Sequence, residues 1–447
     1  MSALDPHANI DLNPAHLEAH WMPFTGNRQF KQNPRMIVAA EQSHYISADG
    51  RRIFDGLSGL WCCGYGHNRP EITAAVTAQL QSLDYSPGFQ FGHPKSFQLA
   101  NKLKQMTPPG LDYVFFTNSG SEAADTSLKM ARAYWRQKGQ PSKTKLIGRS
   151  RGYHGVNFGG ISVGGMGPNR KMYGTPMDAD HIGHTLLSKN TFSRGMPEHG
   201  AELADELLER IALHDASNIA AVIVEPFSGS AGVIVPPRGY LQRLRQICDE
   251  HDILLIFDEV ITGFGRTGAT FGANAFDVVP DIMNLAKGLT NGTIPMGAVV
   301  ATTDIYQTFM ASGGPDYMIE FPHGYTYSAH PVACAAGLAA MEIFERDQLA
   351  QRVADLAPYF EDTIHSLKGL KYVNDIRNYG LAGALTIEAI PGEPTLRPFE
   401  ISMKCWELGF YVRCGGDTVQ LGPNFVSEKE DIDRLVSALG DAIQSLD

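Results

Sequence analysis

The segment DIMNLAKGLTNG (residues 281–292) places a single lysine, Lys287, between an apolar run and a glycine-rich turn. Such a lysine can extend its amine to solvent while its methylene groups cover apolar surface, and for an isolated lysine this is the simpler interpretation. The alternative is an amine held in an apolar site, where its pKa falls and the neutral form can condense with a carbonyl to an imine. The motifs that follow the other apolar runs distinguish between the solvent-exposed and the buried amine.

Two carboxylates end apolar runs in the same way. Asp258 follows ILLIF, and Glu225 follows IAAVIV. Burying a carboxylate is costly unless it is paired. Asp258 is therefore either a capping or salt-bridged residue or the partner of a cationic group such as a protonated heteroaromatic nitrogen.

A small polar turn, NSGS (residues 118–121), follows the apolar run YVFFT and opens directly into a helical pattern. Backbone N–H groups at a helix N-terminus and serine hydroxyls bind anions such as phosphate, and glycine permits close approach. The alternative is an ordinary helix start with Ser121 as the capping residue. The turn lacks the GxxxxGK[ST] pattern, so it does not indicate nucleoside triphosphate binding.

The YHG motif (residues 153–155) follows the run KLIGR, and its aromatic residue either stacks on a planar ligand or packs within a loop. Together, a phosphate-binding turn, a stacking aromatic, an aspartate and a lysine are what pyridoxal phosphate needs. The lysine binds the aldehyde as a Schiff base, and the aspartate keeps the pyridine nitrogen protonated so that the ring accepts electrons. This combination favours the buried-amine interpretation of Lys287.

Short apolar runs alternate with helical patterns along most of the chain, which predicts an α/β fold with a mainly parallel sheet buried on both faces. Ligands of such sheets bind at the carboxyl ends of the strands, where the motifs above lie. Strands are expected at 113–117, 145–149, 219–226, 253–260 and 296–302, and helices at 71–83, 96–106, 121–139 and 239–252.

The C-terminal part predicts a smaller α+β domain. Residues 330–367 read as two helices or one long bent helix, and 383–390 and 410–423 supply strands. The expected division is an N-terminal segment (1–55) packing with the small domain or a partner subunit, a large cofactor-binding domain (56–330) and a small domain (331–447).

Charge, hydrophobic content and cysteine number restrict the class of protein and its possible partners. The 447 residues carry a net charge of −11, with 43% hydrophobic and 19% charged residues, which predicts a globular protein with no nucleic-acid or membrane partner. Six cysteines, too few for a disulfide framework, and a polar N-terminus without a signal segment indicate a reduced, cytoplasmic protein. His181 and His184 have no evident third ligand, so no metal is expected.

Longer motifs resemble a known family. LLIFDEVITGFGRTG (254–268) and PDIMNLAKGLTNGTIPMGAV (280–299), with NSGSEA, YHG, VEP and HGYTYSAHP, resemble the class III aminotransferases of fold type I, from about residue 20 to the C-terminus. LSGLWCCGYGH (57–67), DYSPGFQFGHP (84–94) and FYVRCGGDTVQLGP (410–423) are most similar to the omega-amino acid:pyruvate (β-alanine:pyruvate) members. The resemblance implies transfer of an amino group from an omega-amino acid or primary amine to pyruvate. Diamine, taurine or diaminopelargonate types remain the alternative.

The resemblance implies roles for individual residues. Lys287 would carry the Schiff base and transfer the proton, and Asp258 would pair with the pyridine nitrogen. Tyr153 and Val260 would cover the two ring faces, and Thr326 would reach the phosphate across a dimer or a tetramer of dimers. The full set of implied cofactor-binding residues is Ser119, Gly120, Ser121, Tyr153, His154, Glu225, Asp258, Val260, Ile261, Lys287 and Thr326.

Departures from the related GABA and ornithine enzymes bear on the substrate. Ile261 stands where they have glutamine, and Ser230 stands where they have the glutamate that gates the substrate arginine. Arg413 would then bind a carboxylate without a gate, provided that it is not simply a surface arginine. Candidates for the rest of the substrate pocket, each of which could instead be a core residue, are Trp61, Phe24, Phe89 and Gln420.

Two other classes of protein fit the sequence less well. A cofactor-binding but catalytically silent scaffold would not need both Lys287 and Asp258. A nicotinamide-linked dehydrogenase is disfavoured because GGISVGGMG (159–167) lacks the GxGxxG spacing and opens no clear helix.

Overall fold

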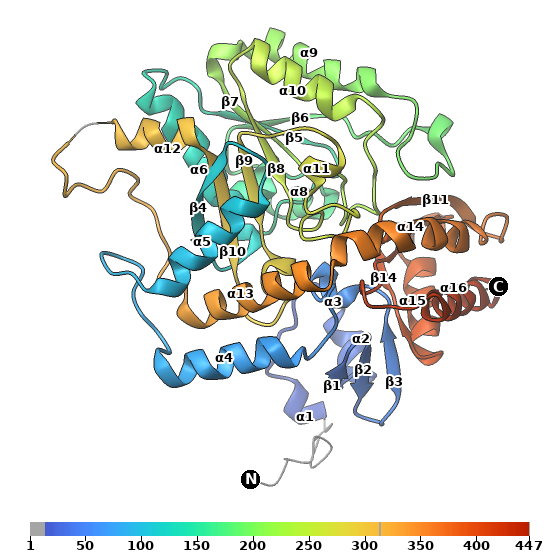
Figure 1. Ribbon diagram of the computed structural model, residues 1–447. Coiled ribbons are helices and arrows are strands. Elements are labelled where there is room, and N and C mark those ends of the chain that lie inside the picture. Colours follow the sequence, from blue (N-terminus) through green and yellow to red (C-terminus); the bar gives the residue numbers. More distant parts are fainter. Residues whose placement is uncertain (1–13, 313, 447) are drawn as a thin grey trace.

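A computed structural model describes residues 14–312 and 314–446 and is built around a seven-stranded sheet (Figure 1). The strand order is β4-β10-β9-β8-β7-β5-β6. All neighbours pair in parallel except β10, which runs antiparallel to both β4 and β9. The strands are β4 (Leu111–Thr117), β5 (Lys145–Arg149), β6 (Ala179–Ile182), β7 (Ile219–Val224), β8 (Leu254–Asp258), β9 (Ile282–Leu285) and β10 (Gly297–Thr302).

Both faces of this sheet are buried, which explains why its central strands are apolar throughout rather than alternating. Along β8, Leu255 and Phe257 belong to one core cluster, whereas Leu254 and Ile256 belong to another on the opposite face. Helix α6 (Gly120–Gln137) packs on the second face, and α10 (Tyr240–Glu250) packs on the first. The predicted α/β class with a mainly parallel sheet is confirmed.

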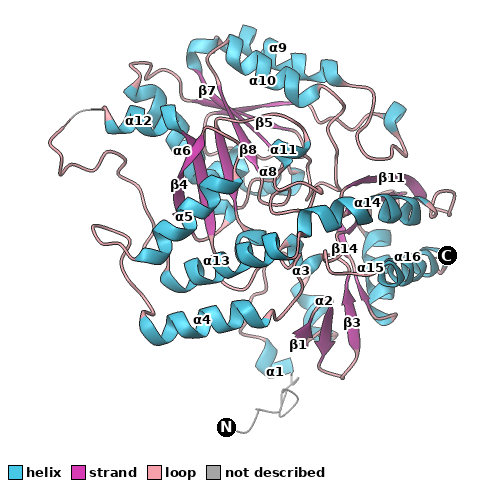
Figure 2. Ribbon diagram, in the orientation of Figure 1, coloured by secondary structure: helices cyan, strands magenta, loops and turns pink. Residues whose placement is uncertain are grey.

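The other helices cover the sheet or extend from it (Figures 1 and 2). The large helices α4 and α5 both pack against α13 beside the sheet. The helices not yet given are α1 (Pro14–Leu17), α2 (Asn27–Gln32), α3 (Ser58–Trp61), α4 (Pro70–Ser82), α5 (Pro94–Met106), α7 (Phe158–Val163), α8 (Gly167–Tyr173), α9 (Glu206–His214), α11 (Gly272–Ala275), α12 (Thr303–Met310) and α13 (Pro331–Arg346). Short 3₁₀ helices are η1 (Ser188–Asn190), η2 (Ala201–Asp205), η3 (Ala216–Asn218) and η4 (Lys287–Thr290).

A second, four-stranded sheet of order β11-β12-β15-β14 lies in the C-terminal part. Helices α14 and α15 contact this sheet, and α16 packs against both helices. The stretch 330–367 forms two helices, α13 and α14, because Gln348 adopts a left-handed φ of 48° between them. The elements are α14 (Leu349–His365), β11 (Val373–Tyr379), β12 (Ala382–Ile387), α15 (Leu396–Glu407), β14 (Arg413–Gly415), β15 (Thr418–Leu421) and α16 (Lys429–Gln444).

The N-terminal strands join a third sheet of order β1-β2-β3-β13. Strand β13 comes from the C-terminal part and pairs in parallel with β3 through Phe410 and Phe54. The strands are β1 (Ile37–Glu41), β2 (His44–Ser47), β3 (Arg52–Asp55) and β13 (Phe410–Tyr411). Residues 1–13 of the predicted N-terminal segment lie outside the described residues, and the three-part division of the chain stays a prediction.

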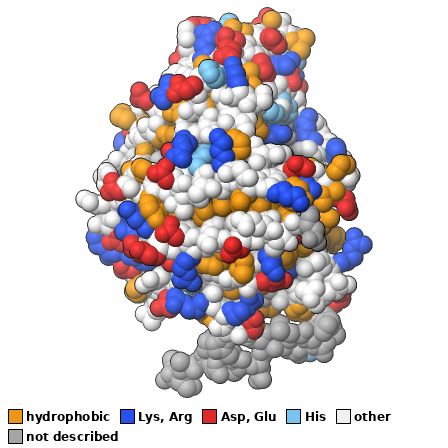
Figure 3. Space-filling view, turned by 90° about the vertical axis from the view of Figure 1, so that its right-hand side faces the viewer, with side chains coloured by type: hydrophobic (Ala, Val, Ile, Leu, Met, Phe, Trp, Pro, Cys, Tyr) orange, Lys and Arg blue, Asp and Glu red, His pale blue; other side chains and the backbone are white. Residues whose placement is uncertain are grey.

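Surface charge and helix length bear on possible partners. On the face in Figure 3, acidic and basic side chains are interspersed rather than gathered into one basic patch. Within residues 14–312 and 314–446, no helix is both long enough and apolar enough to cross a bilayer.

Candidate active site

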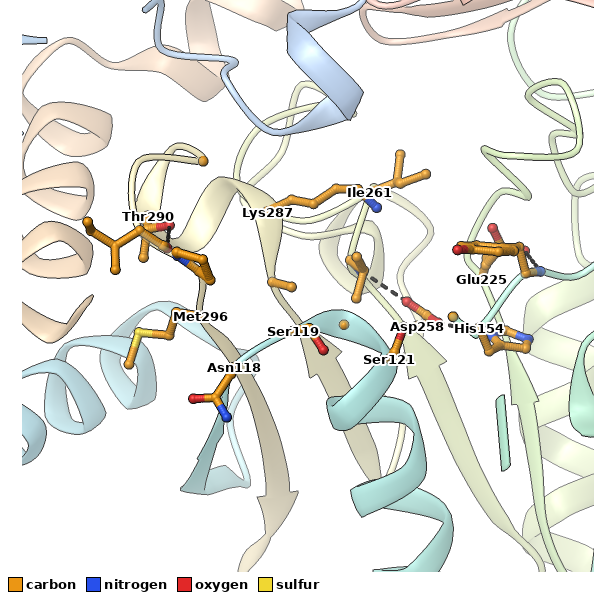
Figure 4. Close-up of a pocket in the computed structure, with 18 residues that line it drawn as sticks. Asn118, Ser119, Ser121, His154, Glu225, Asp258, Ile261, Lys287, Thr290 and Met296 are labelled. Atoms are coloured by element: carbon orange, nitrogen blue, oxygen red, sulfur yellow. Dashed lines mark hydrogen bonds and ion pairs between the residues drawn. The ribbon is translucent and has the colours of Figure 1, made fainter. Parts of the chain in front are cut away.

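A cavity of about 270 Å³ opens at the carboxyl ends of the parallel strands (Figure 4). Strand β4 runs in the same direction as β8 and β9 because two antiparallel pairings with β10 separate them. The turns that follow these strands therefore meet at one edge of the sheet. The lining residues are Asn118, Ser119, Gly120, Ser121, Tyr153, His154, Gly155, Glu225, Asp258, Val260, Ile261, Ala286, Lys287, Thr290, Gly292, Ile294, Pro295 and Met296.

Lys287 lies in the cavity wall, two residues after the end of β9. Its backbone is left-handed with φ of 46°, an uncommon conformation for a residue with a side chain. The turn that carries it is anchored from elsewhere: Asn291 accepts a hydrogen bond from the Tyr65 N–H (3.0 Å) and donates one to the Gly66 carbonyl (2.8 Å). Burial lowers the pKa of Lys287, and the nearby charge of Arg413 adds to this shift. Asp258 and Cys62 oppose the shift. The result favours a neutral, nucleophilic amine.

Asp258 is the last residue of β8 and is buried. Its Oδ1 accepts a hydrogen bond from the Val260 N–H (3.2 Å), and its Oδ2 lies 2.8 Å from Nδ1 of His154. A carboxylate only accepts hydrogen bonds, so this contact requires the proton to sit on Nδ1. The buried Nε2 of His154 has no partner among the described residues. The arrangement holds a carboxylate inside the cavity with one fixed orientation.

Glu225 follows β7 and shapes the loop that carries Tyr153. Its carboxylate accepts the N–H groups of Tyr153 (3.1 Å) and Gly229 (3.2 Å), while burial raises the pKa of Glu225. Arg149 donates to the Glu225 carbonyl at 2.7 Å. Glu225 therefore fixes the position of the aromatic residue in addition to lining the cavity.

The NSGS turn forms the start of α6, an 18-residue helix. Ser119 is the capping residue, because its Oγ accepts the Glu122 N–H at 3.2 Å. The alternative of Ser121 as the cap is therefore wrong: Ser121 Oγ instead accepts the Val156 N–H at 3.2 Å. A Cβ added to Gly120 would lie 3.0 Å from both methyl groups of Val260, so glycine keeps this turn close to the opposite wall. The turn offers the N-terminus of a long helix to an anion.

Some residues singled out from the sequence do not line this cavity. Phe24 and Phe89 are exposed (75% and 54%), and Thr326 lies on an exposed loop, where its carbonyl accepts from Tyr85. Trp61 is buried beneath Arg266, and Gln420 is buried with its amide donating to the Ser230 carbonyl at 3.0 Å.

Arg413 is half-buried in β14, opposite Gln420. Its charge acts on groups in the cavity wall: burial raises the pKa of Tyr153, and Arg413 opposes that shift. The guanidinium thus lies within electrostatic range of the cavity without lining it.

The returning wall from Thr290 to Met296 was not identified from the sequence. It brings Gly292, Ile294 and Pro295 back to the cavity between η4 and β10. Two features of the sequence could have indicated this segment: it follows Lys287 closely, and it contains the glycine and proline that end the turn.

Comparison with known proteins agrees with this geometry. Residues 25–443 match the family model described as aminotransferase class-III. The chain is 61% identical over 443 residues to an omega-amino acid–pyruvate aminotransferase of Pseudomonas putida, covering 98% of this chain and 99% of that protein. It is 62% identical over 442 residues to a beta-alanine–pyruvate aminotransferase of Pseudomonas aeruginosa, covering 99% and 98% respectively.

Solved structures of similar fold are transaminases. An (S)-enantioselective omega-transaminase from Thermomicrobium roseum matches with a TM-score of 0.89 at 33% identity over 96% of each chain. A PLP-bound amine transaminase from an uncultivated Pseudomonas species matches with a TM-score of 0.89 at 35% identity, covering 95% of this chain and 98% of that one. The chain belongs to the class-III aminotransferases.

Proposed function

We propose that this aminotransferase moves an amino group from an omega-amino acid such as β-alanine, or from a primary amine, to pyruvate. The observation that carries the proposal is the presence of Lys287 and Asp258 in one cavity of a chain about 60% identical to relatives with those named activities. The products would be an aldehyde or keto compound and alanine.

The cavity residues fit pyridoxal 5′-phosphate. Lys287 offers an amine to the aldehyde, and Asp258 offers a buried carboxylate to the pyridine nitrogen. The turn from Ser119 to Ser121 offers a helix N-terminus to the phosphate, and Gly120 leaves space there that a Cβ would fill. When bound, the cofactor supplies an electron sink for the bonds at the substrate carbon.

Different residues of the cavity and its surroundings would have different roles in the reaction. Lys287 Nζ would hold the cofactor and, as a free amine, would take a proton from the substrate carbon. General acid–base transfer of this kind contributes about 10²–10⁴-fold. Asp258, oriented by His154, would keep a proton on the ring nitrogen and so stabilise negative charge that the ring accepts. Arg413 binds the carboxylate of the keto acid.

We also propose a homodimer, or a tetramer built from dimers, in which Thr326 reaches the partner's cofactor. Large exposed apolar patches mark interaction surfaces. The single chain exposes such side chains beside the loop of Thr326 and in the segments carrying Phe24 and Phe89, where a second copy would cover them. They are Trp21, Phe24, Phe89, Phe91, Tyr317, Met318, Ile319 and Tyr327. Sedimentation equilibrium tests this: a monomer at micromolar concentration contradicts it. We place the enzyme in the cytoplasm, where its six free cysteines would stay reduced.

A kinetic panel tests the activity. Amino donors (β-alanine, putrescine, taurine and a primary arylalkylamine) are compared with pyruvate and with α-ketoglutarate as acceptor, and Lys287→Ala serves as the inactive control. We expect pyruvate to be the preferred acceptor and β-alanine to be a good donor. A strong preference for α-ketoglutarate would overturn the pyruvate assignment, and full turnover by Lys287→Ala would overturn the role of the lysine.

A further inference from the structure

Two adjacent cysteines, Cys62 and Cys63, lie directly after α3 and point their thiols toward each other. Their Sγ atoms are 3.8 Å apart, and both side chains are half-buried. Adjacent side chains in an extended segment point to opposite sides. Here a tight turn with left-handed residues, including Gly59 (φ 68°) and Trp61 (φ 66°), brings both thiols to one side.

The backbone of this pair is fixed from several directions. The N–H groups of Cys62 and Cys63 both donate to the Ser58 carbonyl at 2.9 Å. The Cys63 carbonyl accepts from the Asn424 side chain at 2.6 Å and from the Gly66 N–H at 3.1 Å. The spacing of the sulfurs is therefore a built feature of the turn.

The sulfurs lie next to the wall of the cofactor cavity. A Cβ added to Gly292, which lines the cavity, would lie 3.1 Å from Cys63 Sγ and 3.2 Å from Cys62 Sγ. Lys287 is close enough for its charge to lower the pKa of Cys62, but the hydrogen bond from Cys63 is the largest cause of that shift, to about 6. The same hydrogen bond raises the pKa of Cys63. Of the two thiols beside the active site, Cys62 therefore loses its proton more readily than Cys63.

The spacing suits one bridging atom better than a disulfide. A disulfide has sulfurs about 2.05 Å apart and Cα atoms usually at least about 4.4 Å apart, whereas adjacent Cα atoms are about 3.8 Å apart, so a disulfide between neighbouring residues is strained. Two sulfurs bound at about 2.3 Å to a single pyramidal centre lie roughly 3.4 Å apart, which a small rotation of the two side chains reaches from 3.8 Å. Within the described residues, no group of three or more His, Cys, Asp and Glu side chains could complete a metal site. A ligand that needs only two thiols is therefore favoured.

We propose that Cys62 and Cys63 form a covalent binding site for monosubstituted trivalent arsenicals and that its occupation blocks the cofactor cavity. An arsine oxide R–As=O and the two thiols give R–As(S–Cys)₂ and one water. The oxygen leaves with both thiol protons, and no oxidant or reductant is required. The substituent R is then held against Gly292 and Lys287.

The remaining cysteines do not offer such a site. Cys248, Cys334 and Cys405 are buried, and burial raises the pKa of each to about 12. Cys414 is half-buried, but its sulfur contacts a hydroxyl, Ser402 Oγ at 3.6 Å, rather than a second thiol. A reagent that requires two thiols should therefore react with Cys62 and Cys63 and with none of the other four cysteines.

The test uses the cofactor-loaded enzyme and phenylarsine oxide, with intact mass and activity measured in parallel. We expect one adduct per chain, with the mass of the probe less one water, and at least a tenfold loss of activity. Excess 2,3-dimercaptopropanol should remove the adduct and restore activity, whereas an equal concentration of 2-mercaptoethanol should not. Peptide mapping should place the bridge at residues 62–63.

Matched variants separate this site from single-thiol chemistry. Cys62→Ser and Cys63→Ser should each abolish the adduct, and Cys414→Ser should keep it. Thermal melting verifies that the variants fold. Peptide mapping of the wild-type adduct locates the bridge without any variant. The proposal is overturned if the native enzyme takes no adduct, if either single variant keeps it, or if the bridge maps elsewhere. Because mass reports binding directly, these outcomes do not depend on the proposed substrates.

Discussion

Nδ1 of His154 lies 2.8 Å from Oδ2 of Asp258, and both side chains are buried. The contact joins the loop after β5 to the end of β8 across the sheet, so a residue of one turn orients the carboxylate of another. A hydrogen bond to a charged group contributes about 1.5–3 kcal/mol, which corresponds to roughly 10–150-fold in rate.

The first prediction concerns this pair. Asp258→Asn should lower kcat/KM by at least about 100-fold, because it removes the charge that stabilises a protonated ring nitrogen. His154→Ala should lower kcat about 10-fold or more by releasing the carboxylate. His154→Asn, whose amide can replace Nδ1, should retain more activity than His154→Ala. Equal activity of the two His154 variants would show that the hydrogen bond does not matter.

The second prediction concerns the loop beside the NSGS turn, which we propose binds the cofactor phosphate. A Cβ at Gly155 (φ 88°) would overlap Ser121 and push it out of the turn. Gly155→Ala should therefore weaken cofactor binding about tenfold or more, as measured by equilibrium dialysis. Gly139→Ala is the matched control: Gly139 has a similar φ of 77° but nothing within 4 Å, so it isolates the backbone cost. Equal cofactor affinity in both variants would contradict the prediction.

The third prediction concerns Arg266, a buried arginine that joins three parts of the chain. Its guanidinium donates to the carbonyls of Leu381 (2.9 Å) and Pro423 (2.8 Å) and to Ser58 Oγ (2.9 Å), and it lies 5.4 Å from the centre of a ring of Trp61. Arg266→Ala would leave buried acceptors unpaired, at a cost of roughly 3 kcal/mol or more.

Thermal or urea unfolding measures this loss. Arg434→Ala is the control, because Arg434 also lies over an aromatic ring, that of Phe410, but is exposed. It should change stability by less than about 1 kcal/mol. Similar losses in the two variants would show that the buried hydrogen bonds of Arg266 are not important.

The fourth prediction concerns pH. Burial raises the pKa of Glu259 from its ordinary value of 4.5 to about 7, although Thr262 and the N–H groups of Gly272 and Ala273 donate to it. Between these values the folded state binds more protons than the unfolded state, so wild-type stability falls as pH rises. This difference in pKa corresponds to at most roughly 3 kcal/mol of stability.

Glu259→Gln cannot ionise, so it should gain stability relative to the wild type as pH rises from 4.5 to about 7 and then level off. Chemical unfolding at several pH values measures the difference. The same substitution at exposed Glu393 should give a difference independent of pH. A difference for Glu259→Gln that shrinks as pH rises would contradict the predicted sign.

The sequence by itself determined the sheet and the residues at its edge. Apolar runs of strand length and helical periodicity are local properties, so most strands and the polar residues that end them could be predicted. Lys287, Asp258, Glu225 and the NSGS turn were placed at one edge because parallel strands share a direction. The interpretation of Lys287 as a buried amine followed from the other motifs at the same edge of the sheet rather than from the residues next to it in the sequence.

Only the tertiary structure decided the contacts between distant segments. The reversal of β10, the bond from His154 to Asp258 and the anchoring of the Lys287 turn by Tyr65 and Gly66 join residues far apart in the chain. The convergence of Cys62 and Cys63 depends on a left-handed turn that no hydrophobic pattern records. Such features depend on which surfaces pack together and on backbone conformation, and residue type and spacing constrain these only weakly.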